Sequence, residues 1–269
     1  MPFATNGHCR LYWRWNGARD RPPLLLLSSI GTDLGLWDRV IAQLSSRFGV
    51  LRMDCRGHGA SDAPPGDYTL DLLATDAQAV MTAAGIESAF VCGISLGGMI
   101  AMTLALQAPA RVRGLILACT SAQMDRGLWQ RRLDAVTQEG TQAIADMALQ
   151  RFFSEAFRKT HPQVVESVRT ALLGMDSAGY AGCCAAIRDM SILAALGEIK
   201  VPTRVIAGAQ DVSTPFEGHG ALIVKAIAGP AGELTDEYPL VLMSILGLYV
   251  PGESLPPPFF FLVVRGGCD

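Results

Sequence analysis

Ser95 is the residue of this chain whose surroundings most clearly indicate chemistry. It lies in the run Gly93-Ile94-Ser95-Leu96-Gly97-Gly98. A serine hydroxyl is a poor nucleophile at neutral pH, so it needs a base to take its proton and a turn that exposes its oxygen. Glycines permit such a turn, because Cβ atoms at their positions would collide with the adjoining strand and helix. The run therefore predicts a nucleophilic serine between a strand and a helix.

An acyl-transfer serine also needs N–H donors for the oxyanion and an acid to orient its base. The N–H of Leu96, at the start of the following helix, is one predicted donor, and the loop of residues 28–32 supplies the second at Ile30. Asp211 follows a late apolar segment and is the candidate acid. An Asp in such a turn also commonly caps it, and this second interpretation stays open.

The elements that would position these residues alternate between strand and helix. Short apolar runs typical of buried strands are Leu24–Leu27, Val50–Met53, Ala89–Cys92, Gly114–Ala118 and Thr203–Ala207. Helical spacing appears near 37–44, 71–84 and 99–108, and an alternating segment at 11–15 predicts an edge hairpin. This order predicts an α/β fold with a mostly parallel sheet and helices on both faces.

Two segments depart from the alternation. Residues 126–196 contain only helical patterns and predict a helical cap inserted into a core formed by residues 1–125 and 197–228. Residues 229–269 contain repeated prolines and offer no long amphipathic helix and no clear final strand-helix pair. We interpret this last segment as an atypical C-terminal tail.

Composition limits the classes of partner. The formal net charge is -3, and no long basic run is present, so we expect neither nucleic acid nor membrane as a partner. The seven cysteines lack regular spacing, and we expect reduced thiols, no metal site and no cofactor. The first residues do not resemble a signal peptide, so the expected location is cytoplasmic.

The four histidines do not include an obvious base. His58 precedes Ser95 in a polar loop and is interpreted as holding that loop together, and His8 and His161 are interpreted as surface or packing residues. His219 follows Asp211 by eight residues in a predicted helix that begins near Pro215. Because a helix there would direct the side chain away from the Asp loop, His219 is interpreted as a surface helix position.

These residues resemble a known family, the 3-oxoadipate enol-lactonases of the α/β-hydrolase fold. The resemblance covers about residues 11–227, and it depends on Ser28–Asp33 with Trp37, Asp54–Asp62, Cys92–Ile100 and the cap segment Gly179–Asp189. Ser28-Ser29 stands where many relatives carry His-Gly. The resemblance implies hydrolysis of a lactone in aromatic catabolism, with Ser95 as nucleophile, Asp211 orienting a histidine, and Ile30 and Leu96 binding the oxyanion.

The chain departs from the family in its last part. Relatives place the catalytic histidine after the last strand, but no histidine occurs between Gly220 and Asp269. We therefore expect impaired lactone hydrolysis, and we hypothesise that a frame shift or recombination replaced the usual C-terminal segment.

Two other functions stay open for the sequence. One is a general carboxylesterase of the same fold, for which Trp129, Arg131 and Arg132 either contact a carboxylate-bearing substrate or form a solvated helix face. The other is a non-catalytic protein that retains a ligand pocket. The sequence does not predict the oligomeric state.

Overall fold

The computed structural model describes residues 2–208, 211–227 and, for the backbone, 261–265. Its strands form one sheet in the order β1-β2-β4-β3-β5-β6-β7-β8. Their bounds are β1 Phe3–Asn6, β2 Cys9–Asn16, β3 Pro23–Leu27, β4 Gly49–Met53, β5 Ala89–Ile94, β6 Val112–Ala118, β7 Thr203–Gly208 and β8 Phe261–Arg265. The sheet is parallel from β4 through β7, while β1, β2 and β8 pair antiparallel with their neighbours.

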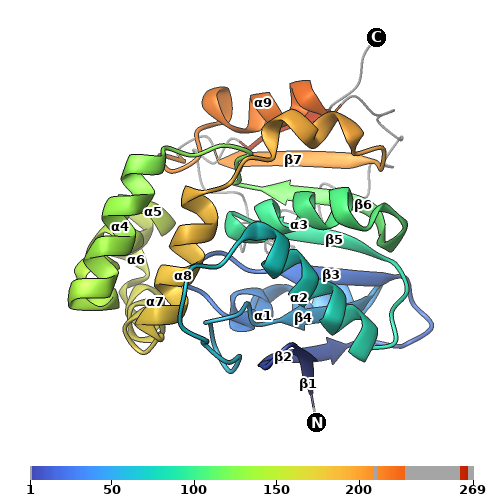
Figure 1. Cartoon of the computed structure of the whole chain (residues 1–269), viewed down its shortest axis with the longest axis horizontal. Coiled ribbons are helices and arrows are strands. Elements are labelled where there is room, and N and C mark those ends of the chain that lie inside the picture. The colour runs from blue at the N-terminus through green and yellow to red at the C-terminus, as the bar shows by residue number, and fades with distance from the viewer. Residues whose placement is uncertain (1, 209–210, 228–260, 266–269) are drawn as a thin grey trace.

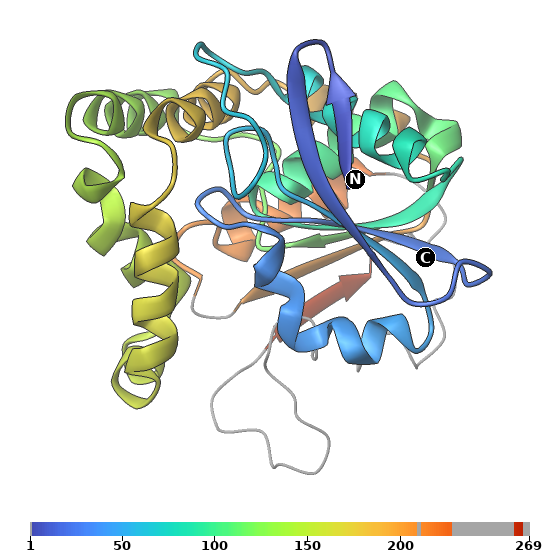
Figure 2. The same cartoon turned by 90° about the horizontal axis from the view of Figure 1, so that it is seen from below.

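Helices cover both faces of the sheet (Figures 1 and 2). The helices are α1 Asp38–Ser45, α2 Leu70–Ala83, α3 Leu96–Gln107, α4 Arg126–Glu139, α5 Ala145–Phe152, α6 Glu155–Thr160, α7 Pro162–Leu173, α8 Ser177–Arg188 and α9 Gly220–Ala226. Short 3-10 turns occupy Leu34–Trp37, Pro109–Arg111, Thr141–Ile144, Leu193–Glu198 and Phe216–Gly218. In Figure 2, α1 lies on the face of the sheet opposite α2 and α3. The layered α/β architecture expected from the sequence is confirmed.

The local sequence explains where these helices begin and end. Thr69 accepts a hydrogen bond from the Leu72 N–H and so caps the start of α2, and Gly85, at φ +73, follows its end. Pro109 stands shortly after α3 and prevents its continuation.

The strand side chains divide the core between the two faces. Leu25 and Leu27 of β3 belong to the larger core cluster beneath α2 and α3, while Leu24 and Leu26 belong to the smaller cluster against Trp37 and α1. This division follows from the period of two along a strand. A strand buried on both faces therefore appears in sequence as the continuous run Leu24–Leu27.

The cap helices α4 to α8 lie together at one end of the sheet (Figure 1). No strand interrupts residues 126–198, as the sequence predicted, although the division at residues 126 and 197 stays a prediction. α8 meets the core at a backbone contact: a Cβ added at Gly57 would lie 2.4 Å from the Gly179 Cα, which belongs to α8. The cap therefore contacts the loop after β4 directly, through backbone atoms of α8.

The tail shows one correction to the sequence interpretation. Residues 261–265 form β8, antiparallel to β7, with Phe261 opposite Gly208 and Arg265 opposite Arg204. The sequence predicted no clear final strand-helix pair, and the strand of such a pair was missed because the prolines around this segment obscured a short apolar run. The rest of the tail lies outside the described residues. No described helix is long and apolar enough to span a membrane.

Candidate active site

Ser95 lies at the junction of β5 and α3 in a strained turn. Its φ of 54° and ψ of -118° fall where L residues seldom lie, and strained conformations of this kind are concentrated at functional sites. The Ser95 N–H donates to the Ala118 carbonyl at 3.0 Å, and the Thr120 hydroxyl donates to the Ser95 carbonyl at 2.6 Å. The backbone of the turn is therefore fixed from β6 while the side chain stays partly exposed.

The glycines around Ser95 are required by close backbone contacts. A Cβ at Gly93 would lie 2.2 Å from the Gly97 oxygen, and one at Gly97 would lie 2.1 Å from the Leu27 oxygen. A Cβ at Gly98 would lie 2.6 Å from the Thr120 hydroxyl. The steric reason for these glycines, inferred from the sequence, is confirmed.

The predicted oxyanion donors come from two adjoining elements. Leu96 is the first residue of α3, so its N–H has no acceptor within the helix. Ile30 follows β3, and β3 pairs with β5 so that Leu27 lies opposite Gly93. No acceptor for the Ile30 N–H lies among residues 2–208 and 211–227. Both N–H groups are thus available near the turn, and their catalytic role stays a prediction.

His58 holds the loop that carries Ile30. Its Nε2 accepts a hydrogen bond from the Gly31 N–H at 3.0 Å, so the ring proton resides on Nδ1 and is donated to the Arg56 carbonyl at 3.1 Å. The side chain is buried, and burial lowers its pKa to about 4. A neutral His58 therefore braces its own loop through Arg56, the role expected from the sequence, and also joins that loop to the one that carries Ile30, which the sequence did not predict.

Asp211 lies just beyond β7, with its carboxylate already engaged in its own turn. One oxygen accepts the N–H groups of Ser213 and Thr214 at 2.8 and 3.0 Å, and the other accepts the Thr214 hydroxyl at 2.7 Å. Burial raises the pKa of the Cys119 thiol, which follows β6, to about 12, and the nearby charge of Asp211 adds to that shift. The turn-capping role is therefore observed, and the catalytic role of Asp211 stays a prediction.

The expectation that His219 occupies a surface helix position is wrong. It separates the 3-10 turn of residues 216–218 from α9, is partly buried, and places Nδ1 2.7 Å from the Ser121 hydroxyl. Because the Ser121 hydroxyl donates its single proton to the Gln123 carbonyl at 2.5 Å, it accepts from Nδ1–H, and Nε2 keeps its lone pair. Burial lowers the pKa of His219, and the charge of Asp211 opposes that shift.

The cap contributes a buried cation near the loop that carries Ile30. Arg132 is 6% exposed, bonds to the Tyr180 hydroxyl, and stacks over the rings of Trp129 and Tyr180 at 4.9 and 5.4 Å. The interpretation of Arg132 as a solvated helix position is wrong, although Arg131 is exposed. The Tyr180 ring closely approaches Gly31, where an added Cβ would lie 3.3 Å from Cε2.

Comparison with known proteins decides the family. The alpha/beta hydrolase fold family matches residues 22–222. The chain belongs to the α/β-hydrolase family. Within it, 3-oxoadipate enol-lactonase 2 of Acinetobacter baylyi is 38% identical over 205 residues, which cover 76% of this chain and 77% of the relative. The enol-lactonase of Burkholderia xenovorans LB400 is 33% identical with a TM-score of 0.82, covering 86% and 88% of the two chains. The resemblance inferred from the sequence motifs is thereby confirmed.

Another solved structure agrees with this assignment. A hydrolase from Pseudomonas aeruginosa PA01 is 38% identical with a TM-score of 0.81, and the match covers 91% of this chain and 97% of that one. These relatives support an ester or lactone hydrolase.

Sequence reasoning missed the partners that meet in this α/β-hydrolase only through tertiary structure. Ser121 carried no motif, and Arg132 looked like one of several helix-surface charges. The one available signal for Ser121 was its position just after β6. The loops after neighbouring parallel strands lie along the same edge of a sheet, so this loop was expected near the loop after β5.

Acid should destabilise this α/β-hydrolase through His58. Its folded pKa of about 4 lies below the ordinary value of 6.5, so the unfolded chain binds the proton more tightly. The stability that depends on a neutral His58 is fully present above pH 6.5 and is lost as the pH falls toward 4. This loss lowers the free energy of unfolding by roughly 3 kcal/mol.

Urea unfolding at a series of pH values measures this effect. His58→Gln is the matched variant, because the glutamine oxygen can still accept the Gly31 N–H but does not titrate. Its free energy of unfolding should depend less on pH in this window, and profiles parallel to wild type would contradict the prediction.

Proposed function

We propose that this α/β-hydrolase acts on a carboxylate-bearing lactone or ester of the 3-oxoadipate enol-lactone type, through an acyl-enzyme at Ser95. The proposal includes a role in aromatic catabolism by the β-ketoadipate route, in the cytoplasm, without a cofactor. The similarity to enol-lactonases supports the reaction class. The observation that carries the substrate class is the buried guanidinium of Arg132.

Arg132 lacks the partner that a buried cation ordinarily has. Among the described residues no carboxylate forms an ion pair with it, and its Nε has no hydrogen-bond partner. Burial and the nearby charge of Arg132 both lower the pKa of a second guanidinium, that of Arg151. Two neighbouring cations without an acid are unfavourable, and a bound carboxylate would offset that cost. Trp129, whose ring lies against Arg132, is the proposed wall of this substrate pocket.

The proposed reaction follows from the geometry of the turn. The Ser95 oxygen attacks the carbonyl carbon of the lactone, and the N–H groups of Ile30 and Leu96 stabilise the negative charge on the carbonyl oxygen. The ring C–O bond then breaks, the released enol oxygen takes a proton, and water hydrolyses the acyl-enzyme. Asp211 is the proposed acid that orients the base.

The base limits this reaction in the chain as it stands. The Ser95 hydroxyl has no hydrogen-bond partner among residues 2–208 and 211–227, and His219 directs Nδ1 at Ser121. Removing the base from a serine triad costs on the order of 10⁶-fold in turnover. We therefore propose that the substrate pocket is retained while turnover is impaired.

Loss of the Arg132 charge should weaken binding of carboxylates selectively. Arg132→Gln is expected to raise the dissociation constant of 3-oxoadipate, the hydrolysis product, by about 10- to 100-fold, since hydrogen bonds to charged groups contribute ~1.5–3 kcal/mol. Calorimetric titration measures this without requiring turnover. The dimethyl ester of the same acid should bind both proteins alike.

Arg131→Gln is the matched control, because Arg131 is the exposed neighbour on the same helix. Equal losses in the two variants, or an equal loss for the neutral ester, would refute a carboxylate site at Arg132. A general carboxylesterase would show no preference for the free acid.

The absence of a described base beside Ser95 favours one second candidate, a ligand-binding protein without turnover. A fluorophosphonate probe distinguishes the two functions. Labelling that disappears in Ser95→Ala indicates an activated serine, while no labelling favours the binding protein.

A further inference from the structure

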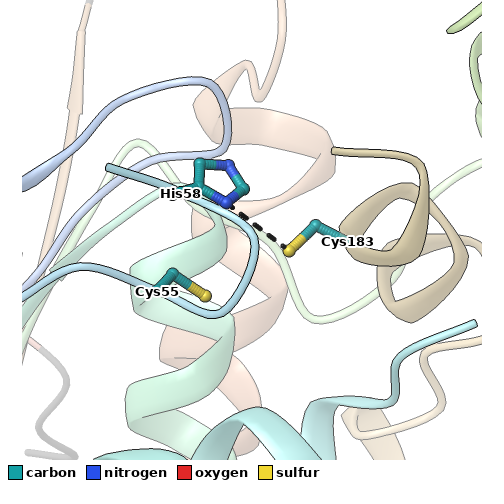
Figure 3. Close-up of side chains that lie close together, drawn as sticks. All are labelled: Cys55, His58 and Cys183. Atoms are coloured by element: carbon teal, nitrogen blue, oxygen red, sulfur yellow. Dashed lines mark hydrogen bonds between the residues drawn. The ribbon is translucent and has the colours of Figure 1, made fainter. Parts of the chain in front are cut away.

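A buried cluster of Cys55, His58 and Cys183 lies beside the loop that carries Ile30, and none of its side chains takes part in the bond-making steps of the proposed hydrolysis. Figure 3 shows two of these side chains on the loop after β4 and the third on α8, all directed toward one another. Their ligand atoms lie within 4.8 Å of one another, and the Cys183 sulfur is 4.0 Å from His58 Nδ1. All three side chains are buried.

The glycine contact between core and cap brings the cluster together. Gly179 packs against Gly57 without intervening side chains. Cys183 lies one helical turn after Gly179 on the same side of α8, and Gly57 lies between Cys55 and His58, next to Arg56, in the loop. The cysteines therefore approach each other from two segments that are far apart in the sequence. The sequence expectation of no metal site overlooked this convergence, because spacing along the chain could not reveal it.

We propose that Cys55, His58 and Cys183 form a binding site for a thiophilic dication of the Zn²⁺ class. Two thiolates and an imidazole are ligands that zinc prefers, whereas Mg²⁺ and Ca²⁺ require oxygen ligands. Two thiolates also balance the charge of a dication, which leaves the buried site neutral. The ligand atoms of a tetrahedral zinc lie about 3.5–3.8 Å apart, so shifts of less than about 1 Å complete the set.

The Arg56 carbonyl oxygen is placed to complete the coordination. It lies 3.1 Å from His58 Nδ1 and 3.7 Å from the Cys183 sulfur. Zinc sites commonly have four ligands, and a carbonyl oxygen or a water fills the last position here. The bound cation would join α8 of the cap to the core loop.

Binding changes protons in a defined way. The two thiols release their protons to solvent, and the single His58 proton shifts by way of solvent from Nδ1 to Nε2, so that Nδ1 can bind the cation. Nε2, which accepts the Gly31 N–H in the metal-free form, then becomes a donor, so this hydrogen bond is lost when the cation binds. The cation is therefore coupled to the loop that carries the Ile30 donor.

Titration of the reduced, metal-free protein with Co²⁺ alone tests the site. One equivalent should produce thiolate-to-cobalt charge-transfer absorption that Zn²⁺ displaces. Cys183→Ala is expected to lower the affinity by more than the 10- to 100-fold typical of losing an outer-shell partner. Cys184→Ala is the matched control, because Cys184 is also buried on α8 but lies outside the cluster.

A second variant and a second measurement guard against misfolding. Cys55→Ala should lose the absorption as Cys183→Ala does, with metal-free thermal unfolding confirming that each variant is folded. Zn²⁺ should raise the midpoint of unfolding in wild type and Cys184→Ala, but not in Cys55→Ala or Cys183→Ala. Absence of the absorption in folded wild type, or its persistence in both cluster variants, would overturn the proposal. Neither readout requires turnover, so failure here leaves the proposed hydrolase untouched.

Discussion

A chimera with a family-type C-terminal segment is expected to hydrolyse the enol-lactone up to about 10⁶-fold faster than this chain. In the chimera, the residues after Ile227 are replaced by the corresponding segment of the Acinetobacter baylyi enol-lactonase 2. The reason is the base: no histidine occurs between Gly220 and Asp269, and His219 bonds to Ser121. The family resemblance implies that the graft supplies a catalytic histidine, while the turn at Ser95 is already formed. Loss of enol-lactone absorbance measures both rates.

Two variants of the chimera identify the source of the gain. Ser95→Ala should abolish it, and so should alanine in place of the grafted histidine. A gain that survives either change would exclude the proposed pair of nucleophile and base. Equal rates for the chain and the unmodified chimera would show that the present C-terminal segment does not limit turnover.

Gly57→Ala is expected to destabilise the protein by about 4 kcal/mol or more. Gly57 has a φ of +78°, where a residue with a Cβ carries about 1–3 kcal/mol of strain. Its added Cβ would also lie 2.4 Å from the Gly179 Cα, which forces α8 away from the core and adds about 1–3 kcal/mol of overpacking, or more. Equilibrium unfolding in urea measures the loss.

Gly85→Ala separates the two contributions to this loss. Gly85 has a similar φ of +73°, but nothing lies within 4 Å of an added Cβ. It should show the strain without the overpacking, so the difference between the variants measures the contact between core and cap. Equal losses of free energy of unfolding in the two variants would mean that α8 moves away from residue 57 without destabilising the protein, which would contradict the prediction.

The sequence predicted the turn at Ser95 accurately because its determinants are local. A buried strand, closely spaced glycines and a helix start all lie within a dozen residues, and each leaves a pattern in the chain. The alternation of strands and helices likewise predicted the parallel sheet. The short strand β8 was missed because prolines around it suggested an irregular tail.

The partners of the site could not be predicted for a different reason. Arg132 resembles an ordinary exposed helix charge until α8 places Tyr180 over it. His219 was expected on a helix surface, yet a 3-10 turn redirects its ring toward Ser121. Cys183 meets His58 only because two glycines let α8 descend onto the core. Each of these contacts depends on tertiary packing between segments distant along the chain.

The backbone contact between Gly57 and Gly179 affects how the substrate range of this protein could change through substitution. Because this contact is made by backbone atoms of two glycines, it offers no side chain whose size could be changed in small steps to shift α8. The contact therefore fixes α8 against the loop after β4, while Trp129, Arg132 and their neighbours in the proposed pocket can change one at a time. In the proposed pocket, substitutions in the cap could therefore change the range of ligands bound without moving the backbone contact between α8 and the core.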